Sequence, residues 1–348
     1  MYYFLLGLII YAFLLSIITK SRILSELLGV LLLSFLTLMI GFRYGVGIDY
    51  FNYEADFNMR YNSFSYEPIY SLLMYFIKTQ FDKFHYLTFV MVFLTNIFIY
   101  LGLKKKNIKG IYLVLAIFIY SSNTALIFMN LMRQGVAVAI FFYASNYIKE
   151  RKLIKFIIFM LLGAGFHYSI LLLLPLYFIK DIKISINKYL VMVVLAYIFV
   201  YSGIAHIVFN FVAYRIPIYS HYYSLRGLFN EDVNILSLGV LLNIIFISLL
   251  MYFTKKEKKY QIDVNYYLIG TLINILAISS FMFDRIGIYL FIFGIAAIPK
   301  MIEHIPNKGK RMFFFILAVI VAFTFFAQSL FLNSETFRLE YKSIFLEV

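Results

Sequence analysis

Apolar runs of about twenty residues recur along the chain, and short polar connections separate them. A helix needs a run of about this length to cross the hydrocarbon core of a bilayer. The runs predict membrane helices at 2–19, 23–42, 85–103, 111–129, 134–148, 190–212, 235–253, 264–283, 286–301 and 312–332. We therefore expect an all-α, polytopic membrane protein.

The apolar stretch 153–179 is long for one span, and the motif GAGFHYS interrupts it in the middle. We interpret it as two short helices, 153–165 and 167–179, that meet near the outer side of the membrane. With these two, the pattern predicts about 12 membrane segments in a single integral membrane domain covering residues 1–348.

Basic residues divide the polar connections into two sets. With 12 segments, 21 of the 31 basic residues fall in connections on one face, and 18 of these are lysines. The positive-inside rule makes that face cytoplasmic. Both termini and the connections 43–84 and 213–234 then lie outside. A single span over 153–179 would break this segregation, so the charges favour the two-helix interpretation.

Composition excludes several classes of protein and of site. Hydrophobic residues make up 63% of the chain and charged residues 14%, whereas a soluble domain has roughly a quarter charged residues. The absence of cysteine excludes disulfides, thiolate metal sites and a cysteine nucleophile. The five histidines show no paired ligand spacing and no carboxylate repeat is present, so we expect no metal.

Arginine, rather than lysine, is the main basic residue of the outer connections, and its planar donor fork suits phosphate or carboxylate. In NLMRQGVAVAIFFYAS, Arg133 and Gln134 begin a helix. The free N–H groups of a helix N-terminus favour an anion, so this segment predicts an anion site. The alternative is an interfacial arginine whose charge reaches water beside a packing seam.

Asp284 and Arg285 are expected to form the whole connection between two spans. A charge at that depth is costly unless it is paired or faces an aqueous cavity. The pair therefore suggests a site, and the alternative is an ion pair that caps a tight turn.

His167 lies at the predicted break between the two short helices. Irregular backbone at membrane depth occurs where it is buried in protein or lines a cavity. A histidine there could act as a base, a proton donor or a phosphate ligand. The alternative is a structural histidine held by one hydrogen bond.

The outer connection 43–84 opens with GFRYGVGIDYFNYEADF, which contains Arg43, Asp49, Tyr50 and Tyr53. Further on, a glutamate precedes Pro68, and this pair predicts a helix start. We expect a short interfacial helix at 68–78. That glutamate, Glu67, is either a site residue or a favourable charge near the helix N-terminus.

Five segments, in order, resemble the EpsG family of multi-pass bacterial membrane proteins, which is grouped with Wzy-type polysaccharide polymerases. They are FRYGVGIDYFNY, YEP, RQGVAVAIFFYA, FHYSILLLLP and DRIGIYL, and the resemblance covers roughly residues 40–290. It implies a GT-C-like helical architecture and no metal, cofactor or nucleotide sugar. It also implies a polymerase of a capsule, exopolysaccharide or O-antigen, which transfers the growing glycan from undecaprenyl pyrophosphate to an incoming lipid-linked repeat unit. This transfer would take place at the outer side of the bacterial cytoplasmic membrane.

This chemistry gives the outer residues expected roles. A pyrophosphate leaving group needs cationic donors where negative charge develops, and these are Arg133, Arg285 and Arg43. A sugar hydroxyl needs a base within hydrogen-bond reach, and in order of preference the bases are Asp49, His167 and Glu67. The expected glycan-binding residues are Tyr50, Tyr53, Gln134, Arg215, Tyr219 and Tyr223.

Other functions remain open at this point. A flippase for lipid-linked oligosaccharides would commonly show internal repeats and midplane charges, and the sequence shows no convincing repeat. A membrane glycan acyltransferase would place polar chemistry on the inner face, which here is mostly lysine. An accessory scaffold is the third alternative. The partners expected are the bilayer, undecaprenyl-pyrophosphate-linked oligosaccharides, a chain-length regulator and a flippase, with no nucleic acid.

Overall fold

A computed structural model describes residues 2–178, 184–205, 207–208, 238–254, 261–277, 281–328 and 342–344. This part of the chain is helical, with one isolated β-bridge and no strand. The chain divides into two compact units, 1–180 with 315–348, and 181–314. The all-α prediction is confirmed.

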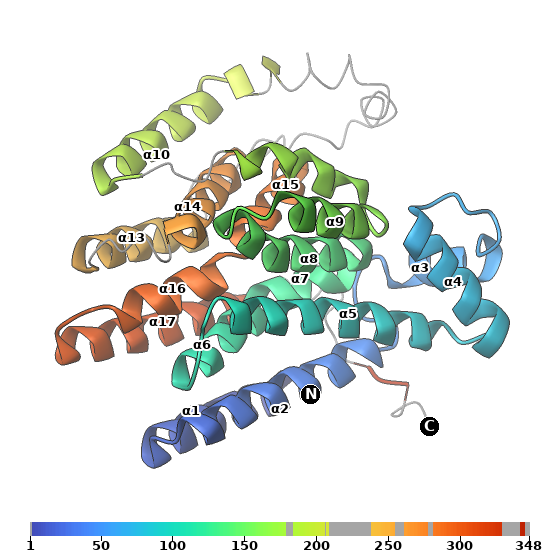
Figure 1. Cartoon of the computed structure of the whole chain (residues 1–348), viewed down its shortest axis with the longest axis horizontal. Helices are drawn as coiled ribbons and strands as arrows, with labels where there is room; N and C mark the ends of the chain where they lie inside the picture. The colour runs from blue at the N-terminus through green and yellow to red at the C-terminus, as the bar shows by residue number, and fades with distance from the viewer. Residues whose placement is uncertain are drawn as a thin grey trace. The chain divides into compact units, whose positions relative to one another are not determined.

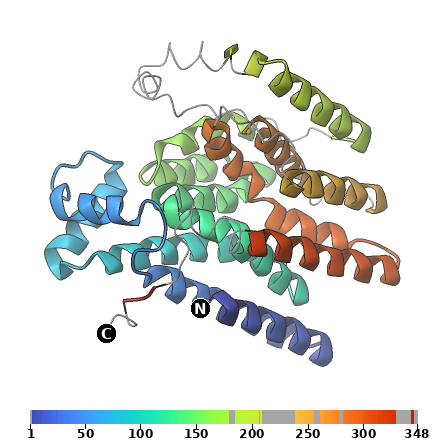
Figure 2. The same ribbon diagram turned by 180° about the vertical axis from the view of Figure 1, so that it is seen from behind.

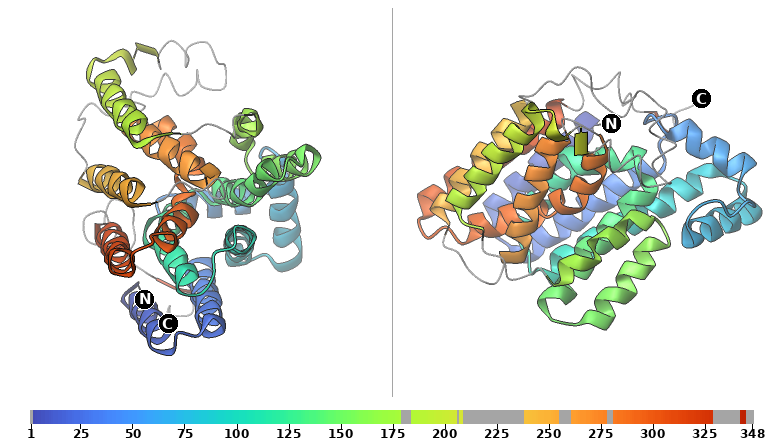
Figure 3. Two further views of the ribbon diagram at one scale, coloured as in Figure 1. Left: turned by 60° about the vertical axis from the view of Figure 1, so that its left-hand side comes forward. Right: turned by 90° about the horizontal axis from the view of Figure 1, so that it is seen from above.

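The first unit contains α1 (Tyr2–Thr19), α2 (Arg22–Gly41), α3 (Tyr50–Met59), α4 (Pro68–Phe81), α5 (Phe84–Lys105), α6 (Ile111–Ile119), η1 (Tyr120–Thr124), α7 (Ala125–Asn130), α8 (Met132–Lys149), α9 (Leu153–Ala164) and η2 (Tyr168–Tyr177). Helix α5 packs between α2 and α8, and α9 with η2 packs against α8 (Figures 1 and 3). Almost every side chain of α8 is buried, so this helix is the core of the unit.

The interruption predicted in 153–179 is confirmed, because α9 ends at Ala164 and η2 begins at Tyr168. The second piece is a 3₁₀ helix rather than an α-helix. Pro175 lies inside it, and proline has no backbone N–H to donate to a helical hydrogen bond.

The connection 43–84, predicted as an outer loop with one short interfacial helix, contains two short helices. The predicted helix start at Pro68 is confirmed, and α4 extends three residues beyond the expected range 68–78. Helix α3 was not predicted, because YFNYEADFNM carries polar and aromatic residues without an apolar stripe. From both sides of the molecule, α3 and α4 are seen together at the N-terminal end of α5 (Figures 1 and 2).

The polar connections of the first unit gather at two opposite ends. Near the C-terminus of α5, Lys104 pairs with Glu26 of α2 at 2.9 Å. At the N-terminus of α5, Thr88 donates to the Gly41 carbonyl at the end of α2, at 2.6 Å. The 22 residues of α5 place these ends about 30 Å apart. Within this unit, the lysine-rich connections therefore lie at the end opposite α3 and α4.

The second unit contains α10 (Ile186–Tyr201), α13 (Leu238–Phe253), α14 (Gln261–Leu276), α15 (Phe281–Phe291) and α16 (Gly294–Glu303). Helix α14 packs against the other four. It approaches α15 closely at Gly270, where a Cβ atom would lie 2.4 Å from the Phe291 nitrogen. Helix α17 (Lys308–Ala327) begins in this unit and continues in the first, where Phe315 packs against Phe13 at 5.7 Å between ring centroids.

The sequence interpretation of Asp284 and Arg285 as a connection between spans is wrong. Both residues lie in the first two turns of α15, and α14 has already ended at Leu276. The polar pair therefore begins a helix instead of joining two.

By length and composition, four helices of the described residues could cross a membrane: Arg22–Gly41, Phe84–Lys105, Phe283–Glu303 and Lys308–Ala327. Several shorter apolar helices accompany them. The chain is therefore a helical membrane protein, and the number of its spans stays a prediction.

Candidate active site

The N-terminus of α4 is docked against the break between α9 and η2. The backbone N–H groups of Ile69 and Tyr70 both donate to the Gly165 carbonyl, at 2.9 and 3.0 Å. A Cβ atom at Gly165 would lie 2.4 Å from the Ile69 side chain, so this close approach requires glycine. The docking brings Glu67, the residue before α4, to the break.

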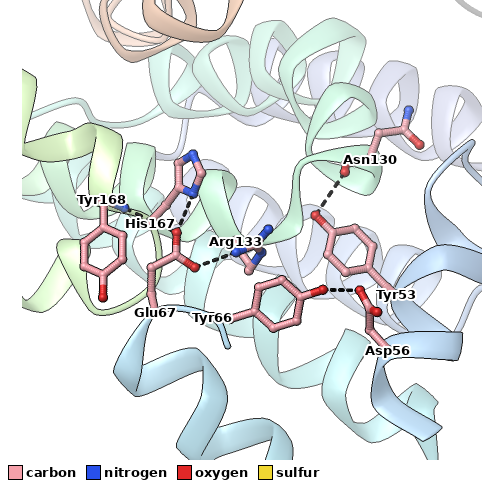
Figure 4. A network of polar contacts seen from close by, with 8 residues as sticks. All are labelled: Tyr53, Asp56, Tyr66, Glu67, Asn130, Arg133, His167 and Tyr168. Atoms are coloured by element: carbon pink, nitrogen blue, oxygen red, sulfur yellow. Dashed lines mark hydrogen bonds and ion pairs between the residues drawn. The ribbon is translucent and has the colours of Figure 1, made fainter. Parts of the chain in front are cut away.

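The Glu67 carboxylate accepts hydrogen bonds from two charged or chargeable side chains of other helices (Figure 4). Nη1 of Arg133 lies 2.5 Å from Oε2, and Nδ1 of His167 lies 2.9 Å from Oε1. The Tyr168 backbone N–H adds a longer contact to Oε1, at 3.4 Å. The Glu67 side chain is only 6% exposed, so these contacts hold a buried anion between α8 and η2.

The surroundings of Glu67 stabilise its charged form. Burial alone would raise its pKa, but the hydrogen bond from His167 and the positive charge of Arg133 outweigh burial and lower the pKa to about 2. An ionised carboxylate only accepts hydrogen bonds, so Nδ1 of His167 is the donor. In neutral His167 the lone pair is then on Nε2, which suits this atom to take a proton.

Arg133 begins α8 and lies over two aromatic rings. Its Cζ is 4.4 Å from the centroid of the Tyr66 ring and 5.5 Å from that of Tyr70. The Tyr66 hydroxyl donates to the Asp56 carboxylate of α3. Helix α3 also contacts the end of α7, just before α8, through Tyr53, whose hydroxyl donates to the Asn130 carbonyl at 3.3 Å. These rings fix the guanidinium beside Glu67 by cation–π attraction.

Of the predicted residues, the structure thus brings Glu67, Arg133 and His167 together. Tyr53 lies nearby, and Tyr66, Tyr70 and Asp56 are cluster residues that the sequence interpretation missed. A signal was present for Tyr66, which directly precedes the glutamate of the predicted helix start. Tyr53 and Asp56 are three residues apart, which places them on one face of α3.

Arg43 is fully buried and donates to main-chain carbonyls. Its Nε reaches the Val46 oxygen at 3.0 Å, Nη1 the Ile40 oxygen at 2.8 Å, and Nη2 the Met129 oxygen at 2.9 Å. Ser343 of the C-terminal segment forms an antiparallel bridge with Arg43. The guanidinium therefore joins the end of α2 to the end of α7.

Asp49 and Tyr50 lie apart from the cluster. Asp49 precedes α3, and its side chain accepts from the Asn52 side chain at 3.4 Å; among the described residues, no side-chain contact links this carboxylate to Glu67, Arg133 or His167. Tyr50 is buried, with its ring 5.2 Å from Phe84 and 5.3 Å from Phe51, which leaves no open face for a sugar.

The other predicted residues are distributed more widely. Gln134 is buried on α8, beside Arg133 in sequence. Arg285 is exposed on α15 in the second unit, and its role stays a prediction. Arg215, Tyr219 and Tyr223 lie outside the described residues.

No three histidine, cysteine, aspartate or glutamate residues gather closely enough to hold a metal ion in the part of the chain that the structure describes. Metal independence stays a prediction.

A family model described as the EpsG family matches residues 26–343. The chain belongs to the EpsG family. EpsG-family proteins are Wzy-type polymerases, so this membership assigns a polysaccharide polymerase-type, glycosyltransferase-like function, and it confirms the resemblance seen in the sequence motifs. The matched range includes Glu67, Arg133 and His167. Searches of curated proteins and of solved structures found no match, and the GT-C-like architecture stays a prediction.

Proposed function

We propose that this EpsG-family protein polymerises a bacterial surface polysaccharide at the outer side of the cytoplasmic membrane. It transfers the growing glycan from undecaprenyl pyrophosphate to an incoming lipid-linked repeat unit. The observation that carries the proposal is the buried Glu67 carboxylate shared by Arg133 and His167. This one cluster combines a donor for a phosphate group with a base for a sugar hydroxyl.

In the proposed transfer, an acceptor hydroxyl oxygen bonds to the anomeric carbon of the donor glycan, and the bond from that carbon to the pyrophosphate oxygen breaks. His167 Nε2 takes the hydroxyl proton, and the pyrophosphate leaves with the electron pair. Glu67 holds Nδ1 and stabilises the imidazolium that forms. We prefer His167 to Asp49 and Glu67 as the base, because Asp49 stands apart and the low pKa of Glu67 makes it a weak base.

Arg133 holds Glu67 through one nitrogen and keeps further N–H groups for the leaving group. Arginine suits this position because its fixed fork of donors can serve a carboxylate and a phosphate together. The negative charge on the pyrophosphate grows as the glycosidic bond breaks, so these donors stabilise the transition state more than the substrate. Arg43 is left out of this role, because its guanidinium already donates to three carbonyls.

The sidedness of the proposal rests on the two ends of the first unit. The lysine-rich end is the cytoplasmic one by the positive-inside rule. The cluster lies at the opposite end, where lipid-linked glycans arrive in the outer leaflet. Substrates carried on isoprenoid lipids can reach such a cluster from the bilayer.

The test uses purified protein in detergent with lipid-linked repeat units from its own organism, EDTA, and no nucleotide sugar. We expect a ladder of longer glycans from the wild type and none from Arg133→Ala. Arg60→Ala is the matched control, because Arg60 follows the last residue of α3, has 65% of its side chain exposed and makes no contact with Glu67 among the described residues.

The control should keep the ladder. A full ladder from Arg133→Ala would remove this residue from the site. No ladder from folded wild type with intact substrate would contradict the polymerase assignment.

A further inference from the structure

Two hydrogen-bond donors are buried beside Glu67 and find no acceptor among the described residues. They are the hydroxyl of Tyr70 and the Nε–H of Arg133. Tyr70 lies in the first turn of α4, is fully buried, and has its ring 5.5 Å from the Arg133 Cζ. An unsatisfied buried donor destabilises the fold, so two of them on neighbouring side chains indicate that an acceptor from outside the chain completes the site.

Three tyrosines lie around Arg133, and two of their hydroxyls already have partners. Tyr66 donates to Asp56, and Tyr53 donates to the Asn130 carbonyl. The Tyr70 hydroxyl is within electrostatic range of Tyr53, Tyr66, Asp56 and Arg133. Burial raises its pKa, so the hydroxyl stays protonated at neutral pH and can donate its hydrogen to an anion.

We propose that Tyr70 Oη and Arg133 Nε together bind one non-bridging oxygen of the pyrophosphate that leaves the donor lipid. The inference rests on the proposed function and adds a leaving-group contact. The Arg133 Nε–H can only donate and the Tyr70 hydroxyl can donate beside it, so one acceptor serves both groups, and the guanidinium charge selects a negatively charged oxygen. Arg133 keeps its Nη1 on Glu67, so the carboxylate and the pyrophosphate bind different nitrogens of the same guanidinium.

The burial of the two side chains indicates how the oxygen enters. The Arg133 side chain is 22% exposed, whereas Tyr70 is fully covered. The oxygen therefore reaches the two donors from the side of the guanidinium.

Tyr70→Phe tests the inference, because it removes only the unpartnered hydroxyl. Tyr120→Phe is the matched control, since the Tyr120 hydroxyl is also buried but donates to Asn96 Oδ1 at 2.7 Å. Thermal unfolding of each purified full-length protein in detergent is followed against inorganic pyrophosphate and, separately, farnesyl pyrophosphate.

Without ligand, we expect Tyr70→Phe to melt at or above the wild-type temperature and Tyr120→Phe to melt below it. With ligand, Tyr70→Phe should need about tenfold more of either probe for the same shift, the size expected for a lost hydrogen bond to a charged group. Tyr120→Phe should keep wild-type affinity. If only farnesyl pyrophosphate binds and does so through Tyr70, the ligand is the lipid headgroup rather than free pyrophosphate, and the inference is supported.

Equal affinity in Tyr70→Phe and wild type overturns the inference, as does the absence of any shift in the wild type. A loss of stability in Tyr70→Phe with unchanged affinity also overturns it, and indicates a structural water on the hydroxyl. Glycan ladders from the same preparations separate the two proposals. If the wild type polymerises but pyrophosphate binding does not depend on Tyr70, only the role of Tyr70 is rejected. If binding depends on Tyr70 but the wild type makes no polymer, only the proposed function is rejected.

Discussion

The two ends of the first unit both use acid–base pairs, and the pair at the lysine-rich end is the more exposed. At the lysine-rich end, Lys104 and Glu26 are 2.9 Å apart with side chains 36% and 21% exposed. At the other end, Arg133 and Glu67 are 22% and 6% exposed, and the carboxylate also binds His167. Water can therefore solvate Lys104 and Glu26 if their pair is broken, whereas the Glu67 carboxylate is too buried to be solvated in the same way.

This difference explains why the two ends suit different tasks. An exposed ion pair contributes about 0–1 kcal/mol to the free energy of unfolding. The lysine-rich end therefore does not depend on any one ion pair, and its net positive charge still orients the chain in the membrane. Breaking a buried pair costs about 3–5 kcal/mol, because one charge is left without compensation. The Glu67 end therefore keeps its groups in one arrangement, as catalysis requires.

The largest expected effect is that of Glu67→Ala, which removes the buried negative charge that distinguishes this end from the lysine-rich end. We expect polymerisation to fall below detection and the free energy of unfolding to fall by about 3 kcal/mol. Chemical denaturation and the glycan ladder measure the two losses.

The double variant Glu67→Met with Arg133→Met sharpens this result. It leaves no unpaired charge, so stability should recover while polymerisation stays absent. Recovery of both would show that the pair is purely structural.

Arg43→Met separates a structural arginine from one that binds ligand. Three carbonyls lose their donor, so the free energy of unfolding should fall by about 2 kcal/mol. Pyrophosphate affinity of the protein that remains folded should not change, whereas Arg133→Ala should abolish it. Thermal shift with and without pyrophosphate gives both quantities, and a loss of affinity at unchanged stability would place Arg43 in the site.

The pH dependence of the free energy of unfolding tests whether the buried Glu67 carboxylate is ionised, and it requires no polymerisation assay. The pKa of folded Glu67, about 2, lies below the 4.5 of an unperturbed glutamate. Its contribution, on the order of 3 kcal/mol in full, is therefore present above about pH 4.5 and lost as the pH falls toward 2. Between pH 6 and 3, denaturation of the wild type should show a greater loss of stability than that of Glu67→Gln. Parallel curves for the two proteins would contradict the assigned pKa.

The smallest effect is expected at the lysine end. Glu26→Gln removes the partner of Lys104 and Arg22, but both lysine and arginine can turn to water. We expect the free energy of unfolding to change by less than about 1 kcal/mol and polymerisation to stay at the wild-type rate. A loss of stability as large as that of Glu67→Ala would show that the energetic contribution of these ion pairs does not depend on their exposure.

Much of the fold follows from the sequence, because apolar runs and breaks are local signals. The break at His167, the helix start at Pro68 and the position of Arg133 at the start of α8 were all predicted. The sequence motifs assigned them to one site, but their direct contacts were not predicted, because these depend on Gly165 accepting two N–H groups from α4 across nearly one hundred residues of sequence.

Arg43 shows the other limit of sequence reasoning. An arginine near acids and tyrosines suggested a phosphate ligand, but its donors are directed to Val46, Ile40 and Met129 carbonyls. Such partners carry no side-chain signature. Helix α3 was missed for a related reason, since its residues are ordered by contacts to Asn130 and Tyr66 rather than by an apolar stripe.

The most direct test of the account is the elongation rate of His167→Gln, compared with that of His85→Gln. His85 is the second residue of α5, at the same end of the unit, and makes ring contacts with Phe42 and Tyr86. If His167 is the base held by Glu67, His167→Gln should elongate glycans at least about 100-fold more slowly, with folding and pyrophosphate affinity kept, and His85→Gln should match the wild type. Equal rates for His167→Gln and wild type would contradict the claim that this cluster is the active site.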